Sequence, residues 1–545
     1  MPLNQQNQPL SPAGRATGAD HDVVVIGAGL GGVYAIHRFR QQGLSVLCLE
    51  GADRVGGVWN HNRYPGARVD VESQDYCYFF SPEIYHEWRW SERYATQPEI
   101  LRYIEFVADK IGVKPFISFN TWLTDAEWRD GLWHLTTKDD RRLTSRFLVM
   151  ATGNYSAARK PNFKGLDDFK GEWVQTAHWP DRPVPIAGRR IAVIGTGSSG
   201  IQTTPVVAKD AQHVYVFQRT PNYSVPAHNG PLNEANYAKV KSDVLGTRAR
   251  LLSNPGGSHI RVGKKKHDEY TPEEMREELE RKWAFGGHGM NGVFSNQGTN
   301  QAANDIVSDF VRSKIRHIVR DPALAEKLCP FDHPIGTRRL CVDSDYYASF
   351  NRDNVTLVDA REEAIVEINA TGIRTTQGQR DVDLIIFALG FDAFTGQFDR
   401  IRIVNDKGQR PNDAWKTGPC AYLGLMTAGF PNLFILTGPG SPAVLANLFL
   451  HNEFHADWVT ECIDYLDKNG YCSIEATESA QADWAAQVQA ASGPFLRRNV
   501  RNSMVHVNAD GSQVFIPYIG GFGRYVQKCR DVAAKGYEGF QLTKG

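Results

Sequence analysis

Residues 22–32, DVVVIGAGLGG, decide the fold. After Asp22, four β-branched apolar residues, Val23 to Ile26, lead into three glycines, Gly27, Gly29 and Gly32. A helical pattern, VYAIHRFRQQG, comes next, and a second apolar run, LSVLCLE, ends at Glu50. A strand, a glycine turn, a helix and a second strand in this order predict a βαβ unit.

Each glycine of this unit has a physical reason to be there. We expect Gly27 to make the turn out of the strand, Gly29 to admit a pyrophosphate against the backbone, and Gly32 to let the helix pack close to the strand. The helix N-terminus offers free N–H groups to phosphates. Glu50 stands where a carboxylate accepts hydrogen bonds from the adenosine ribose, and its charge repels a 2′-phosphate. The unit is therefore predicted to bind FAD or NAD rather than NADP.

A second unit of the same kind occupies residues 189–220, RRIAVIGTGSSGIQTTPVVAKDAQHVYVFQRT. Its second strand ends without an acidic residue, and Arg219 and Thr220 stand there instead. A guanidinium and a hydroxyl in place of a carboxylate suit a 2′-phosphate, so this unit is predicted to bind NADPH. The residues expected to contact it are Gly195, Thr196, Gly197, Ser198, Ser199, Gly200, Arg219 and Thr220.

The composition limits the class of protein. A chain of 545 residues is too long for one hydrophobic core, so we expect about two or three domains. Lys+Arg and Asp+Glu balance at 61 each, which argues against nucleic acid or an anionic membrane as the main partner. No apolar run reaches the roughly 18 residues that a membrane span requires, and residues 1–20 lack the apolar core of a signal peptide.

The eight cysteines form no CxxC pair, which disfavours a dithiol redox centre and a zinc knuckle. So few cysteines in so long a chain favour a reducing compartment, and we expect a cytoplasmic protein. His451 and His455 are four residues apart on a predicted helix, but no third ligand is evident. We expect structural or surface histidines and no metal.

The order of these signals predicts an α/β fold with two Rossmann-like dinucleotide-binding domains and a helical insertion. Charged, helical patterns mark the insertion, which is expected to be either a lid or substrate wall, or a purely structural insert. The expected boundaries are a disordered tail at 1–20, an FAD domain at 21–155 and 385–545, an NADP domain at 156–226 and 331–384, and the insertion in the NADP domain at 227–330.

Two longer motifs lie between the two glycine units, the second of them just before the second unit. GGVWNHNRYPGARVDVES covers residues 56–73, and FKGEWVQTAHWP covers 169–180. With both, the chain resembles the type I Baeyer–Villiger monooxygenases over nearly its whole length after the tail. Further similarity to the phenylacetone and steroid monooxygenase branch lies in ERYATQPEILRYIEFVADK (92–110), GTRRLCVDSDYY (336–347) and YLGLMTAGFPNLF (422–434).

The resemblance implies a reaction and a set of site residues. NADPH reduces FAD, O2 adds to the reduced flavin as a peroxide, and this attacks a hydrophobic ketone to give an ester or lactone. Arg339 is implied as the catalytic cation and Asp70 as its carboxylate partner, although a buried ion pair without a catalytic part would give the same pattern. Arg338 is implied at the 2′-phosphate. The implied FAD contacts also include Gly57, Trp59, Asp70 and Tyr76, and the implied substrate contacts, which could equally be core residues, are Val444, Leu445 and Leu448.

The chain departs from the family pattern at two places. In the hallmark motif Phe169, Gly171, Thr176, Trp179 and Pro180 fit, but Gln175 replaces histidine. Gln175 cannot carry charge, so we predict retained activity with altered coupling or coenzyme affinity. Near the C-terminus, SMVHVNADGSQVF (503–515) has Met504 where relatives carry tryptophan, which makes coenzyme closure the least secure expectation.

Three other functions share parts of this pattern. A flavin monooxygenase that oxidises nitrogen or sulfur shares both nucleotide units, and sulfoxidation could accompany ketone oxidation. A pyridine-nucleotide disulfide reductase is disfavoured by the missing CxxC. A non-catalytic NADPH-binding protein stays open because of Gln175 and the altered loop at 503–515. We expect a monomer or a weak homo-oligomer.

Overall fold

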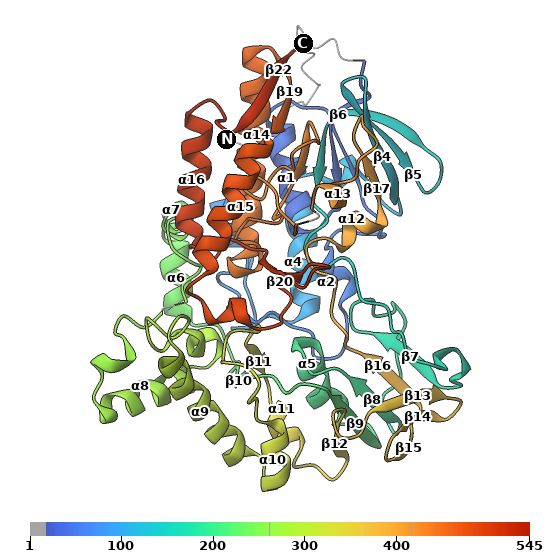
Figure 1. The fold of residues 1–545 in the computed structure, drawn as a ribbon, viewed down its shortest axis with the longest axis vertical. Helices are drawn as coiled ribbons and strands as arrows, with labels where there is room; N and C mark the ends of the chain where they lie inside the picture. Colours follow the sequence, from blue (N-terminus) through green and yellow to red (C-terminus); the bar gives the residue numbers. More distant parts are fainter. Residues whose placement is uncertain (1–17, 261, 416) are drawn as a thin grey trace.

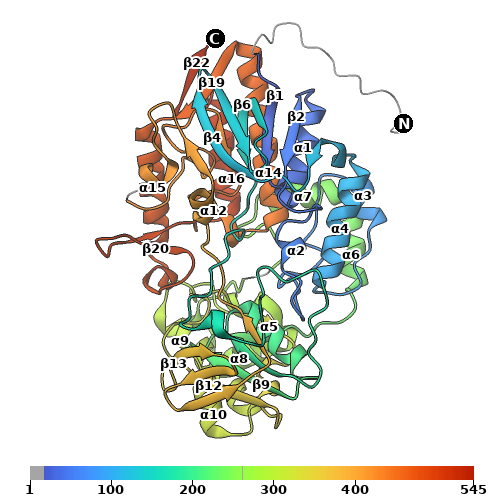
Figure 2. The same ribbon diagram turned by 90° about the vertical axis from the view of Figure 1, so that its right-hand side faces the viewer.

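The computed structural model describes residues 18–260, 262–415 and 417–545. The chain forms two lobes, one above the other in Figure 1, and Figure 2 shows the narrower region between them. An eight-stranded sheet lies in the upper lobe and a five-stranded sheet in the lower one. Each sheet contains one dinucleotide unit, which confirms the predicted fold class. The units are β1 (His21–Ile26), α1 (Leu30–Gln41) and β2 (Val46–Leu49), and β8 (Arg190–Ile194), α5 (Ser198–Val207) and β9 (His213–Gln218).

The upper sheet is built around β1, which pairs in parallel with β2 and with β6 (Arg142–Met150). Val23, Val24 and Val25 of β1 are fully buried, as expected for a strand covered on both faces. Helix α14 (Leu448–Asn469) packs along α1, so the C-terminal part of the chain completes this lobe. The other strands of the sheet are β3 (Ile117–Ser118), β4 (Leu123–Arg129), β5 (Leu132–Thr137), β17 (Arg402–Val404) and β18 (Leu433–Ile435).

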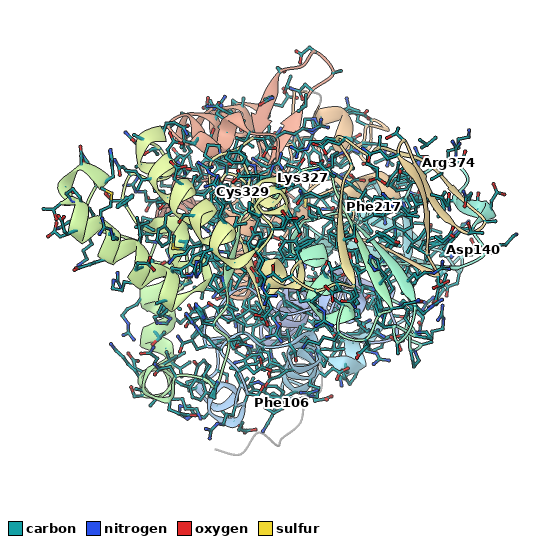
Figure 3. The ribbon with its side chains drawn as sticks, turned by 90° about the horizontal axis from the view of Figure 1, so that it is seen from below. Phe106, Asp140, Phe217, Lys327, Cys329 and Arg374 are labelled. Carbon is teal, nitrogen blue, oxygen red and sulfur yellow. The ribbon has the colours of Figure 1, made fainter. Side chains whose placement is uncertain are left out.

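The lower sheet is parallel throughout, in the order β12 (Val355–Asp359), β9, β8, β16 (Leu384–Phe387) and β7 (Glu172–Gln175). The expected domain boundary between residues 384 and 385 is therefore wrong by a few residues. The reason is that the LIIF run of β16 is buried between β8 and β7 and completes the lower sheet. Figure 3 shows this lobe from below, with Phe217 of β9 inside it and Arg374 of the small antiparallel β14 (Gly372–Thr375) at its edge.

The predicted helical insertion is helical but divides between the lobes. Its first helices pack on the core of the upper lobe, through residues such as Tyr237, Val240 and Leu251. Its later helices bury Leu279, Val307 and other apolar residues in the core of the lower lobe. The insertion therefore differs from the expectation that it belongs to the NADP domain alone. Its helices are α6 (Glu234–Lys241), α7 (Val244–Leu252), α8 (Pro272–Phe285), α9 (Gln301–Ile318) and α10 (Pro322–Leu328).

The predicted tail at 1–20 lies mostly outside the described residues. Of its last three residues, Asp20 is bound to β6, since its backbone N–H donates to Thr144 Oγ1 at 3.0 Å and its carboxylate accepts from Thr144 N at 2.7 Å. Among the helices of the described ranges, none combines the length and apolar character needed to cross a lipid bilayer.

Candidate active site

The first glycine turn forms an open backbone surface at the start of α1. Gly29 precedes the helix and no side chain caps it, so the first N–H groups of α1 are available to a ligand. A Cβ added to Gly32 would lie 1.9 Å from the carbonyl oxygen of Gly27, so only glycine permits this close packing. Gly29 faces Gly57 of the GGVW motif, because a Cβ on Gly29 would lie 3.6 Å from Gly57 Cα. This surface without side chains fits a pyrophosphate.

Glu50 lies beside this turn and is buried. Its Oε2 accepts from Ala28 N at 2.6 Å and its Oε1 from Ala52 N at 2.8 Å, so each oxygen keeps a further acceptor position. Burial raises the pKa of Glu50 despite these hydrogen bonds. Trp59, the last residue of the GGVW motif, donates from Nε1 to the hydroxyl of the buried Tyr76 at 3.0 Å. These positions fit the predicted contacts with the first nucleotide.

The second glycine turn repeats this geometry at the start of α5. A Cβ on Gly200 would lie 1.9 Å from the Gly195 oxygen, while a Cβ on Gly197 would meet no atom within 4 Å. Thr196 Oγ1 donates to the Thr220 carbonyl oxygen at 2.9 Å and so ties the turn to the end of β9. Ser198 Oγ lies 3.4 Å from Cys341 Sγ. The half-buried Ser199 follows it on α5.

Two arginines are available near the end of β9. Arg219 is exposed and makes no hydrogen bond or ion pair within the part of the chain that the structure describes. Arg338 is half-buried, with its Nη2 3.8 Å from Asp332 Oδ2. The segments that follow these two arginines lie side by side, because β10 (Ser224–Pro226) pairs in parallel with β11 (Cys341–Asp343). Both guanidiniums fit the expectation of a 2′-phosphate site.

Asp70 and Arg339 come from opposite lobes and meet in a bidentate ion pair. Arg339 Nε donates to Asp70 Oδ2 and Nη2 to Oδ1, both at 2.6 Å. The Asp70 side chain is 15% exposed, whereas that of Arg339 is 42% exposed. Burial alone would raise the pKa of Asp70, but the Arg339 charge and the neighbouring His288 ring hold it well below its usual range. The same pairing outweighs burial at Arg339 and raises its pKa, so this guanidinium stays charged.

His288 is a third member of this cluster that the sequence did not predict. It lies in η4 (Gly287–Gly292) of the insertion, with its Nε2 3.6 Å from Asp70 Oδ2. Its Nδ1 lies 3.2 Å from Asn291 Nδ2. The Nε2 atom is buried and has no hydrogen-bond partner among the described residues. No motif marks this histidine, because only the fold of the insertion brings it to Asp70.

The hallmark segment connects the two lobes. Phe169 is buried, and a Cβ on Gly171 would lie 2.4 Å from its ring. Gln175 ends β7, and its Nε2 donates to the Arg159 carbonyl oxygen at 3.2 Å. Thr176 N–H donates to the Phe387 oxygen at 3.0 Å, and Trp179, which Pro180 follows, packs on the core of the lower lobe. The backbone N–H of Trp179 donates across to the oxygen of His61, which ends α2 (Val58–His61) next to the first nucleotide site.

Of the three predicted substrate contacts, Leu445 lies at a cavity between the lobes. Leu445 lines a cavity of about 320 Å³, together with residues of both lobes and with Arg497. Val444 packs instead on the small core around Met504, and Leu448 is the half-buried first residue of α14. Arg497 is the second site residue that the sequence did not predict.

The C-terminal segment at 503–515 forms a hairpin of β20 (Val505–Val507) and β21 (Gln513–Phe515). Figure 1 places it in the region between the lobes. Met504, which replaces the expected tryptophan, is buried in the small core beside Ala443. The hairpin is thus anchored to the upper lobe by an apolar contact.

His451 and His455 pack against each other and against Tyr525. Both are buried on α14, with their Nε2 atoms 3.0 Å apart, and His455 Nε2 lies 2.7 Å from the Tyr525 hydroxyl. The described residues contain no group of three or more side chains that could hold a metal ion. All eight cysteines lie within the described ranges and are free.

Comparisons with known proteins agree with this geometry. The family model of the pyridine nucleotide-disulphide oxidoreductases matches residues 21–243. The chain is 38% identical to the 2-oxo-Δ3-4,5,5-trimethylcyclopentenylacetyl-CoA monooxygenase of Pseudomonas putida, over 97% of this chain and 99% of that protein. It is 35% identical to the cyclohexanone 1,2-monooxygenase of an Acinetobacter species, over 96% of this chain and 97% of that protein.

The solved structures agree as well. A steroid monooxygenase bound to NADP has a TM-score of 0.92 and 48% identity, covering 96% of this chain and 100% of that one. OTEMO in complex with FAD and NADP has a TM-score of 0.93 and 37% identity, with the same coverage. A Baeyer–Villiger monooxygenase of Pseudooceanicola batsensis is 37% identical over 96% of both chains. The two nucleotide cradles, the Arg339–Asp70 pair and this similarity over nearly the full length lead to one conclusion: the chain belongs to the Baeyer–Villiger monooxygenases.

Proposed function

We propose that this protein uses FAD, NADPH and O2 to insert one oxygen atom beside the carbonyl of a hydrophobic ketone, giving an ester or lactone. The Arg339–Asp70 ion pair carries the proposal, because it joins the lobes between the two nucleotide cradles. Asp70 follows the motif whose Gly57 faces the first cradle, and Arg339 precedes Cys341, which contacts Ser198 of the second. Relatives named for cyclohexanone and cyclopentanone support a ketone substrate.

The residues present fit both nucleotides. The first cradle combines a bare glycine turn with the buried acceptor Glu50, and the second combines a bare turn with Arg219 and Arg338. The acid disfavours a 2′-phosphate and the arginines favour it, so FAD is assigned to the first cradle and NADPH to the second. FAD, once reduced by NADPH, supplies the activation of O2.

Arg339 is the proposed catalytic residue, and Asp70 is its positioning partner. Asp70 engages Nε and Nη2 of the guanidinium, so Nη1 stays without a partner in the described part of the chain. A cation fixed in this way stabilises negative charge that develops on the ketone oxygen, without reorganising during the reaction. Because its pKa is raised, Arg339 remains protonated over the whole working pH range.

An isotope experiment tests the proposed reaction. The purified holoenzyme is given NADPH, 18O2 and 4-phenylbutan-2-one, and the products are identified by mass spectrometry. We expect an ester that carries one 18O atom, with NADPH consumed alongside it. An absence of ester while NADPH is consumed would contradict the proposal.

Oxidation of nitrogen or sulfur is the second candidate. The chain is 36% identical over 96% of its length to a phenazine N-monooxygenase of Lysobacter antibioticus. Phenazine and thioanisole are therefore assayed beside the ketone. Oxidation of phenazine or thioanisole, without conversion of the ketone, would favour this second function.

A further inference from the structure

The cavity beside Leu445 has an apolar wall and, among the described residues that line it, one charged side chain. It encloses about 320 Å³, enough for a small organic molecule. Pro442, Leu445 and Phe495 contribute to its apolar surface, together with Ile519 and Phe522. Among the described residues that line it, Arg497 is the one cation, and none is an aspartate or glutamate.

Arg497 lacks a counter-ion in the described part of the chain. Its Nε and Nη2 both donate to the carbonyl oxygen of Gly336, at 3.1 and 2.5 Å. Its Nη1 has no partner there, and no described carboxylate forms an ion pair with it. Burial and the nearby Arg339 charge lower the pKa of Arg497 to about 10, so the guanidinium is still protonated at neutral pH.

Arg497 is half-buried, and a cation that is partly withdrawn from water and satisfied by one carbonyl dipole is costly unless an anion completes its environment. Asp70, the carboxylate that pairs with Arg339, forms no ion pair with Arg497. Tyr518 lines the same cavity, and its hydroxyl makes no hydrogen bond to any residue that the structure describes. The cavity thus offers a charged donor and a neutral donor to the same ligand group.

We propose that Arg497 and Tyr518 bind a carboxylate of the substrate, so that the enzyme prefers ketones with an acid at the far end of an apolar body. This inference rests on the proposed ketone oxidation. Gly336 and Thr337, which line the cavity, stand three and two residues before Arg339. One small molecule can therefore place its acid at Arg497 while its carbonyl lies toward Arg339.

Two matched substrates and three variants test this. The holoenzyme is assayed with 4-phenylbutan-2-one and with 4-(3-oxobutyl)benzoate, which adds one carboxylate to the same skeleton. The variants are Arg497→Gln, Arg497→Lys and the control Arg498→Gln, since Arg498 bonds to Gln489 and Ser492 and does not line the cavity. Calorimetric titration of the oxidised holoenzyme with 4-phenylbutyrate, which has an acid but no ketone, gives a Kd independent of turnover.

We expect the parent to have a KM for the acid about tenfold below that for the neutral ketone. Arg497→Gln should raise the KM for the acid and the Kd of 4-phenylbutyrate about tenfold or more, with a much smaller change for the neutral ketone. Arg497→Lys should keep part of the preference, and Arg498→Gln should keep all of it.

Equal KM values in the parent, or an equal rise for both ketones in Arg497→Gln, would overturn the inference. An anion of the coenzyme is the other source of negative charge. A rise in the KM for NADPH alone would assign Arg497 to the coenzyme and likewise overturn it. Ester formation from the neutral ketone by the parent tests the proposed function separately, so the two failures are distinguishable.

Discussion

At the scale of single residues, the position of the Arg339 guanidinium depends on the groups that hold Asp70 in place. His288 is the second cationic or donor group beside this carboxylate, 3.6 Å from Oδ2. We expect His288→Phe to lower the kcat for ester formation about five- to tenfold, because Asp70 loses this neighbour and Arg339 becomes less fixed. His288→Asn, which keeps a side-chain donor, should retain more of the activity. The measurements are kcat, KM and FAD content for both variants.

A purely structural role of His288 would predict a different pattern. Loss of FAD or of folded protein, with normal turnover in the fraction that remains, would contradict the positioning role. An unchanged kcat and pH profile in His288→Phe would contradict it as well.

Gln175 is the residue at which this chain departs from the hallmark motif. Its amide holds the Arg159 carbonyl oxygen at the end of β7, within the segment that connects the lobes. We expect Gln175→His to change the fraction of NADPH that ends as hydrogen peroxide, with ketone oxidation retained, because the connection positions one lobe against the other. Peroxide and ester are measured per NADPH consumed. Identical yields in the variant and the parent would refute this prediction.

Residues within long motifs could be predicted from the sequence, whereas isolated ones could not. Asp70 and Arg339 stand in motifs that resemble a known family, and the structure brings them together across 269 residues of chain. His288 and Arg497 stand in no such motif. Each reaches the site only because a loop from another part of the chain folds against it, and such long-range packing leaves no local signal.

At the scale of elements, the two strand–glycine–helix units allow a matched test of which nucleotide each one binds. In both units a Cβ on the third glycine would lie 1.9 Å from a backbone oxygen, so the helix must move. We expect Gly32→Ala to be purified with little or no FAD. Gly200→Ala should keep its flavin spectrum and raise the KM for NADPH about tenfold or more. Loss of FAD in Gly200→Ala, together with a raised KM for NADPH in Gly32→Ala, would instead assign FAD to the second unit and NADPH to the first.

The strand pair β10–β11 predicts a pH-dependent stability. Burial raises the pKa of Asp343, at the end of β11, to about 6 from an unfolded value of 3.8. The folded protein therefore holds an extra proton between these pH values. This proton stabilises the folded protein fully below about pH 4, and the stabilisation is lost as the pH rises through about 6. The free energy of unfolding falls by about 3 kcal/mol over this range.

Asp343→Asn should remove this dependence, because the amide stays neutral at every pH. We expect the variant to have a higher Tm than the parent at pH 8 and a similar Tm near pH 4, at one scan rate for both. A variant less stable than the parent at pH 8 would show that the carboxylate form is the favoured one.

Most elements were predictable because their periodicity is local. The two βαβ units lie where the patterns place them, and the insertion is helical as its patterns predict. The errors concern which lobe an element joins. The run at β16 and the helices α6 and α7 have apolar faces that fit either core, and only tertiary packing decides between them.

At the scale of the whole molecule, function depends on two lobes that bring their residues to one place. The upper lobe holds the first cradle and Asp70, the lower lobe holds the second cradle and Arg339, and the insertion contributes His288. Neither lobe alone contains the ion pair. We therefore expect that one substitution at the contact between the lobes separates nucleotide binding from ketone oxidation.

The ester yield per NADPH in Arg339→Ala tests most directly whether ketone oxidation depends on the cation between the lobes. The substitution removes the fixed cation and leaves both glycine cradles as they are. The account predicts a variant that binds FAD and is reduced by NADPH, yet forms at least about a hundredfold less ester from 4-phenylbutan-2-one than the parent. Ester formation at the parental yield in Arg339→Ala would contradict it.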